Sequence, residues 1–215
     1  MVRPDKPCGE PALRWIRVLS VGTVAASIVA GFQLIIPATA SACELTPRSQ
    51  SRHSDTTAHG PCTSGGFITG EDGVKTWVGP LARYHVTGTV NYPTNPPIGG
   101  PHNPVLLNCD GDVYTKPVRN ENAVHSLEHG AVWVTYNSKA SEADVQALAE
   151  KVRSTPYTMM SPYEKQKDPM MLTAWGHQRT VTSASDPNVD RFFETYAQGA
   201  QTPEPGAPCT GGAMQ

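Results

Sequence analysis

The sequence predicts a single compact α+β domain with a mostly antiparallel sheet and two flanking helices. Strand-like runs occur both before and after a helix-like segment, without the regular alternation of strand and helix that characterises parallel sheets. The 20 prolines and 19 glycines indicate long, turn-rich loops around the core. A length of 215 residues with 38% hydrophobic residues is sufficient for one core once the N-terminus is set aside.

Residues 1–42 have the pattern of an export signal. Basic residues precede an almost wholly apolar run at 18–36, and Ala40 and Ala42 suit cleavage after residue 42. Because the apolar run is longer than a usual signal core, a retained membrane anchor helix is an equal alternative, and lipidation of Cys43 is a third. All three alternatives predict an exported protein that is either secreted or held in the cell envelope.

The remaining chain divides into three predicted parts. Residues 43–73 are rich in Ser, Thr and Arg, contain His53 and His59, and show no apolar period, which predicts a flexible, disordered linker. The globular domain is expected over 74–199, followed by a C-terminal tail at 200–215. The formal net charge of −2 gives no basis for a nucleic-acid partner.

The centre of the domain is expected at the stretch His125-Ser-Leu-Glu-His129-Gly130. Two histidines four residues apart lie on one face of a helical turn, and the glycine ends that turn after barely one repeat. The β-branched and aromatic run at 131–136 predicts a buried strand directly afterwards. The side chains of His125, Glu128 and His129 should therefore lie at the start of a central strand.

The elements around this centre follow from local patterns. Ser141 and Asp144 predict the start of a helix with an apolar stripe, and Asp186-Pro187 predicts a second helix that stops at Gly199. Alternation predicts strands at 84–90, 157–161, 170–175 and 177–182, the second and third on either side of a turn. In the strand at 84–90, His85 faces either solvent or the site.

Four cysteines would lie in the oxidising space outside the cytoplasm: Cys43, Cys62, Cys109 and Cys209. They allow three pairings. We favour Cys109 with Cys209, because the tail has no core of its own and a cross-link would hold it, which leaves Cys43 with Cys62. The alternative is that Cys109 is a thiolate metal ligand.

The loop from Asn91 to Pro104 contains five prolines and two glycines, so its backbone is stiff and irregular. His102, near the end of this loop, would lose little further entropy on binding a metal. With His125 and His129 it provides three nitrogen donors. Glu128 would orient one of these histidines, and His85 would lie nearby.

The methionines favour copper as the metal. A thioether beside imidazoles suits Cu(I), so Met170 or Met171 is a candidate fourth donor, although a methionine in a strand more often fills a core. The predicted ligand is therefore a copper ion, Cu(I) or Cu(II), with zinc second. The function would be copper storage, delivery or tolerance, with a copper-donor or copper-acceptor protein of the envelope as partner.

Two other functions remain open. The pattern His-x-x-Glu-His matches an inverted zincin signature, in which zinc and a general base hydrolyse a bond, but the expected single turn is short for that chemistry. The histidines could also satisfy a buried hydrogen-bond network in a structural or interaction domain of the envelope. Metal-dependent stability would separate these alternatives.

Seven motifs together resemble one known family. They are Val90-Asn-Tyr-Pro93, Pro97-Ile-Gly-Gly-Pro-His102, Asn108-Cys109, the run from Val118 to Gly130, Ser161-Pro-Tyr163, Thr173-Ala-Trp-Gly176 and the run from Pro203 to Cys209. The chain is similar to the bacterial domain of unknown function 3105, common in exported or membrane-anchored proteins of actinobacteria. The resemblance implies an extracytoplasmic location and an association with copper handling.

Overall fold

The computed structural model describes residues 65–214. The predicted signal or anchor, most of the predicted linker, Cys43 and Cys62 lie outside the described residues. Among the residues that are described, no helix is long and apolar enough to cross a membrane.

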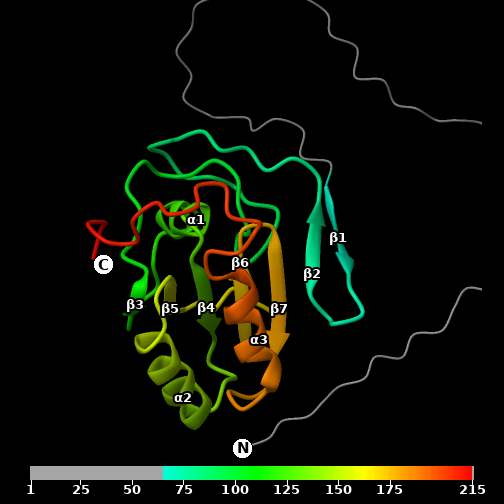
Figure 1. Cartoon of the computed structure of the whole chain (residues 1–215). Coiled ribbons are helices and arrows are strands. Elements are labelled where there is room, and N and C mark those ends of the chain that lie inside the picture. Colours follow the sequence, from blue (N-terminus) through cyan, green and yellow to red (C-terminus); the bar gives the residue numbers. More distant parts are fainter. Residues whose placement is uncertain (1–64, 215) are drawn as a thin grey trace, which may run out of the picture. The chain divides into compact units, whose positions relative to one another are not determined.

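Seven strands form one sheet in the order β1-β2-β7-β6-β4-β5-β3 (Figure 1). Their bounds are β1 Gly66–Thr69, β2 Lys75–Val78, β3 Asp110–Val113, β4 Val132–Tyr136, β5 Thr158–Pro162, β6 Met170–Ala174 and β7 His177–Val181. Neighbouring strands are antiparallel from β1 to β4, whereas β5 runs parallel to both β4 and β3. The predicted α+β class with a mostly antiparallel sheet is confirmed.

Strand β4 occupies an interior position because its sequence is apolar on both faces. Its first four residues are buried, and Trp133 pairs with Thr173 of β6 on one side and Met159 of β5 on the other. Interior strands must be apolar on both sides, and the Val-Trp-Val-Thr-Tyr run satisfies this requirement. The predicted strand is therefore confirmed.

Three helices pack on the sheet: α1 Asn120–Glu128, α2 Glu142–Arg153 and α3 Pro187–Tyr196. Both predicted helix starts are confirmed, because the side chain of Ser141 accepts from the Asp144 amide and that of Asp186 accepts from the Asn188 amide. The third helix, α1, has nine residues where the sequence predicted barely one turn. Burial of nearly all its side chains stabilises a helix too short to persist alone.

The two faces of the sheet are covered differently. Side chains of α2 and α3 form one core cluster with alternate residues of β4 and β6, including Val134 and Leu172. On the opposite face, α1 packs with Trp133, Met159 and the disulfide. In Figure 1, α3 lies across β6 and β7, α2 lies at the lower end of the sheet, and α1 lies near the upper end with the long loops and the C-terminal segment.

Three sequence predictions differ from the structure. Residues 84–90 form no strand, and only an isolated parallel bridge joins His85 to His102. Strands β5 and β6 are not neighbours, because β4 lies between them. Strand β1 falls inside the stretch 43–73 that was predicted to be linker. The first two differences depend on which distant segment supplies the backbone partner, which local alternation does not encode. Strand β1 instead pairs with β2, the next strand in the chain.

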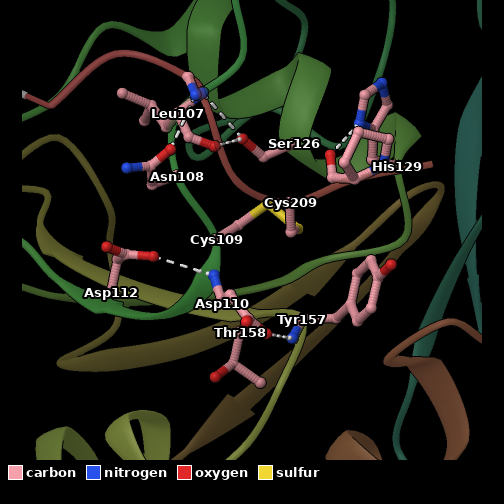
Figure 2. Close-up of a disulfide and its surroundings, with 12 residues drawn as sticks. Leu107, Asn108, Cys109, Asp110, Asp112, Ser126, His129, Tyr157, Thr158 and Cys209 are labelled. Carbon is pink, nitrogen blue, oxygen red and sulfur yellow. Dashed lines mark hydrogen bonds between the residues drawn. A yellow bond between two sulfur atoms is a disulfide. The ribbon is translucent and has the colours of Figure 1, made fainter. Parts of the chain in front are cut away.

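Cysteines 109 and 209 form the predicted disulfide, which closes a sequence separation of 100 residues. Both cysteines are buried. Figure 2 shows this disulfide and, near it, the segment from Leu107 to Asp110 and the side chain of His129. The disulfide excludes Cys109 as a thiolate ligand in this state.

Candidate metal centre

Helix α1 presents two histidines and a carboxylate at its C-terminal end. His125 lies in its last turn, Glu128 is its final residue, and His129 is the C-cap. Gly130 follows with φ +92°, a conformation that favours glycine and ends the helix. The His125 and His129 side chains share one face, as their spacing predicted, with ring centroids 4.6 Å apart.

The proline-rich loop brings His102 to this end of α1, and a backbone bridge to His102 brings His85. The Val86 amide donates to the His102 carbonyl at 2.7 Å, and the His102 amide donates to the Tyr84 carbonyl at 3.2 Å. This short bridge places the His85 ring 5.0 Å from the His102 ring and 5.1 Å from the His125 ring. His85 is exposed, so it forms the open side of the cluster.

The loop is held on its other side by Trp175, which follows β6. A side chain at Gly99, which has φ +146°, would meet the Trp175 ring at 3.2 Å, so glycine permits close packing there. The same tryptophan stands edge-on to the His102 ring at 6.1 Å. His102 is fully buried, and its position is therefore fixed by both backbone and packing.

Three histidines share one hydrogen-bonding arrangement. The Nδ1 atom of His102 lies 2.8 Å from the Gly100 carbonyl, that of His125 lies 2.6 Å from the Asn103 carbonyl, and that of His129 lies 2.7 Å from the Pro208 carbonyl. A carbonyl oxygen only accepts, so Nδ1 must donate its proton in each case. In the neutral rings, Nε2 therefore carries no proton and has a free lone pair.

These Nε2 lone pairs face other acceptors at short range. The Nε2 atoms of His125 and His129 are 3.1 Å apart. The Nε2 atom of His102 lies 2.8 Å from Oε2 of Glu128, so the two form an ion pair when the ring is protonated and two facing lone pairs when it is neutral. Acceptor facing acceptor is unfavourable unless a positive charge lies between them. That charge is either an added proton or a metal ion.

The donor atoms fit a single ion in spacing. One ligand atom from each of His85, His102, His125 and Glu128 lies within 4.8 Å of every other. Two donors bound to one ion at about 2.1 Å are at most about 4.2 Å apart, and about 3.4 Å apart in a tetrahedral site, so metal binding would draw these donors closer together. The Nε2 atom of His129 adjoins this group through His125.

Charged side chains surround the histidines. Arg83 donates from Nε to Oε1 of Glu128 at 3.0 Å, and its Nη2 lies 3.7 Å from Glu204. Glu204 also places Oε2 3.6 Å from Nε2 of His129. With the rings neutral, two carboxylates and one guanidinium leave the centre with a net negative charge, which attracts a cation.

The electrostatics keep the donors in the states that bind metal. Burial lowers the pKa of His125 to about 4, and the neighbouring His129, His102 and His85 rings add to this effect, against the hydrogen bond to Asn103. Neutral imidazole is the form that binds a metal ion.

Burial alone would raise the pKa of the Glu128 carboxyl, but the His102 ring in its protonated form and the Arg83 guanidinium together hold it below its usual range. Glu128 is therefore an ionised carboxylate at neutral pH.

A family model described as protein of unknown function (DUF3105) matches residues 85–211. The chain belongs to this family. No curated protein and no solved structure gives a match. The DUF3105 region contains every histidine of the cluster, Glu128 and both disulfide cysteines, and its description assigns no activity.

The structure of this DUF3105 domain brings two of the three predicted histidine ligands, His102 and His125, together with His85 and Glu128. The third, His129, lies beside His125. The structure does not bring Met170 there. Met170 packs in the core with α2 and α3, on the face of the sheet that α1 does not cover. Met171 is buried on β6, four residues before Trp175, which corresponds to about 13 Å along a strand. Met170 is therefore not placed to complete the site, whereas Met171 lies on the other face of β6 and stays a predicted donor.

Several site groups were missed by sequence reasoning. Arg83, Glu204 and the Pro208 carbonyl all contact the cluster, and the last two come from the C-terminal segment. One signal could have revealed them, because pairing Cys209 with Cys109 brings the preceding residues close to the Asn108-Cys109 motif. No local pattern marks Arg83.

Proposed function

We propose that this chain is an exported protein of the cell envelope that binds a divalent transition-metal ion, copper(II) in preference to zinc. The ligands are Nε2 of His102, His125 and His129, with Glu128 and His85 completing the set. The role is storage, delivery or tolerance of copper, in exchange with a donor or acceptor protein. The observation that carries the proposal is the pair of short contacts between acceptors, 2.8 Å and 3.1 Å, which a bound cation would relieve.

The donor set determines which metal is proposed. The donor atoms that lie close together are imidazole nitrogens and carboxylate oxygens, whereas Cys109 forms a disulfide and Met170 packs in the core. Imidazoles suit copper and zinc, and Cu(II) binds most tightly among the divalent ions of this series. Because these donors include no thioether, we favour Cu(II) over Cu(I).

Binding is favoured over hydrolysis by the state of Glu128. A general base works best when its pKa lies near the working pH, whereas the pKa of Glu128 is lowered. Its Oε1 accepts from Arg83, and its Oε2 faces Nε2 of His102. The carboxylate is therefore better suited to hold a cation than to take a proton from water.

The decisive experiment is a competition titration of the full chain with Cu(II) and with Zn(II) against a chromophoric chelator. We expect one tight site, with Cu(II) bound more tightly than Zn(II). His125→Ala and His102→Ala should each weaken binding by at least about tenfold, because each removes a direct ligand.

The matched control is His177→Ala. His177 also donates from Nδ1 to a backbone carbonyl, that of Trp175, but stacks on Tyr196 on α3, so its removal should leave the affinity unchanged. The variant His53→Ala/His59→Ala tests whether histidines outside the described residues bind the metal instead. Wild-type protein that binds neither metal, or that binds equally after His125→Ala, would overturn the proposal.

Electron paramagnetic resonance of the Cu(II) protein gives an independent measurement. Hyperfine coupling should report at least three nitrogen ligands, and one fewer in His129→Ala. A spectrum with oxygen ligands only would contradict the proposed set.

A further inference from the structure

The C-terminal segment after α3 crosses the end of α1 that carries the cluster. The Gln198 amide donates to the Gly130 carbonyl at 2.9 Å, and the Glu204 amide donates to the Glu128 carbonyl at 3.1 Å. Further on, the Cys109 amide donates to the Cys209 carbonyl at 2.8 Å. The backbone of 198–209 therefore runs from the helix end to the segment that precedes β3.

This segment supplies the group that orients His129. The His129 ring donates from Nδ1 to the carbonyl of Pro208, and the next residue, Cys209, is covalently joined to Cys109. The position of the carbonyl is thus set by a disulfide one residue away, next to which Figure 2 shows the His129 ring. Hydrogen-bond partners of ligand histidines fix the tautomer and direction of the ring.

The same segment supplies charge. Glu204, half-exposed, is the carboxylate whose oxygen lies 3.6 Å from Nε2 of His129 and which also faces Arg83. Release of the segment would remove both the carbonyl that orients the ring and this negative charge. The remaining ligands come from α1 and the proline-rich loop and would stay in place.

We propose that the disulfide and residues 198–209 form a clasp that positions His129 and Glu204, so that the metal centre is complete only after Cys109 and Cys209 are oxidised. This inference rests on the proposed metal binding. It assigns Pro208, through its carbonyl, and the Cys109–Cys209 disulfide as positioning groups of the centre.

The clasp also places an oxidation before metal loading. The two thiols form one S–S bond and lose two protons and two electrons to a disulfide-bearing oxidoreductase, whose own disulfide becomes a dithiol. Such a reaction takes place in an oxidising compartment. Reduced chain would therefore bind metal weakly until this exchange has occurred.

The test is a double-mutant cycle on the full chain, with Cu(II) affinity measured by chelator competition. Cys109→Ser/Cys209→Ser should weaken binding by about 10- to 100-fold, the usual effect of removing a group that orients a ligand. In a His129→Ala/Glu204→Gln background the same serine pair should change the affinity by no more than about twofold, because both side chains that the clasp positions are then replaced.

The cycle distinguishes an effect of the disulfide on the positions of His129 and Glu204 from an effect on the stability of the whole domain. Serine variants must first show the circular dichroism spectrum of the wild type at the titration temperature. Equal losses in the two backgrounds would mean that the disulfide only stabilises the fold, and would overturn the clasp. Wild-type protein that binds no metal would instead overturn the proposed function.

If the serine pair does not fold, Gln198→Ala replaces it. Gln198 donates from Nε2 to the His129 carbonyl and accepts from the Gly206 amide, so the substitution loosens the segment while the disulfide remains. We expect several-fold weaker binding in this variant and a smaller effect when His129→Ala is also present. Unchanged affinity in a folded Gln198→Ala protein would contradict the clasp.

Discussion

Stability of the metal-free protein should fall on mild acidification, and His125 should account for a defined share of that loss. Burial lowers the pKa of His125 to about 4 from its ordinary 6.5. Between these pH values the unfolded chain binds a proton at this position and the folded chain does not. The contribution of the neutral His125 ring to the free energy of unfolding is therefore fully present above pH 6.5 and is lost as the pH falls towards 4.

The expected magnitude follows from the two pKa values. His125 is 6% exposed, so little solvent screening applies. Linkage gives a loss of about 2 kcal/mol between pH 7 and pH 5 and about 3 kcal/mol between pH 7 and pH 4. For a domain of this size, 2 kcal/mol corresponds to a drop in Tm of about 4–8 °C.

The assay compares wild type with His125→Gln by urea denaturation in the presence of a chelator. Glutamine does not titrate in this range but retains a donor for the Asn103 carbonyl. The difference in unfolding free energy between the two proteins should shrink by about 2 kcal/mol from pH 7 to pH 5. If both proteins lose the same stability over this range, the ring is not buried in its neutral form and the reasoning fails.

Three further predictions concern groups around the cluster. Cu(II) should quench tryptophan fluorescence strongly in wild type and much less in Trp175→Phe, because this ring stands 6.1 Å from His102; equal quenching would contradict the placement of the metal. Gly99→Ala should cost about 1–3 kcal/mol in unfolding free energy, because of its positive φ and its contact with Trp175. Gly88→Ala, which meets nothing within 4 Å, is its control in the same denaturation assay, and similar losses would refute the packing argument. Arg83→Met should tighten Cu(II) binding a few-fold at low salt, because it removes a positive charge beside Glu128; a titration that shows weaker binding would assign Arg83 a supporting role.

Local patterns predicted the elements whose cause is local. Ser141 and Asp186 cap helices because a side-chain oxygen satisfies an amide two or three residues away, and such pairs are visible in the sequence. The alternation of Val132 to Tyr136 likewise predicts a buried strand. The spacing of His125 and His129 placed both rings on one face, because helix geometry alone fixes that relation.

The remaining features required the tertiary arrangement. His85 was expected on a strand, yet it reaches the cluster through a backbone bridge to His102, and nothing around residue 85 specifies that partner. Met170 was expected near the site, but the register of β6 turns its side chain to the core of α2 and α3. Side-chain direction on a strand depends on pairing across the sheet, which involves residues far away in the chain.

The sequence by itself determined the kind of chemistry: imidazole donors at helical spacing, a stiff loop that ends in a third histidine, and a cysteine pair able to tie down the tail. Only the folded chain decided which atoms meet. The three rings donate to the carbonyls of Gly100, Asn103 and Pro208, and these carbonyls come from segments that approach one another only after the sheet, α1 and the disulfide are assembled. Orientation of a side chain is a property of its surroundings, and those surroundings are built by long-range contacts.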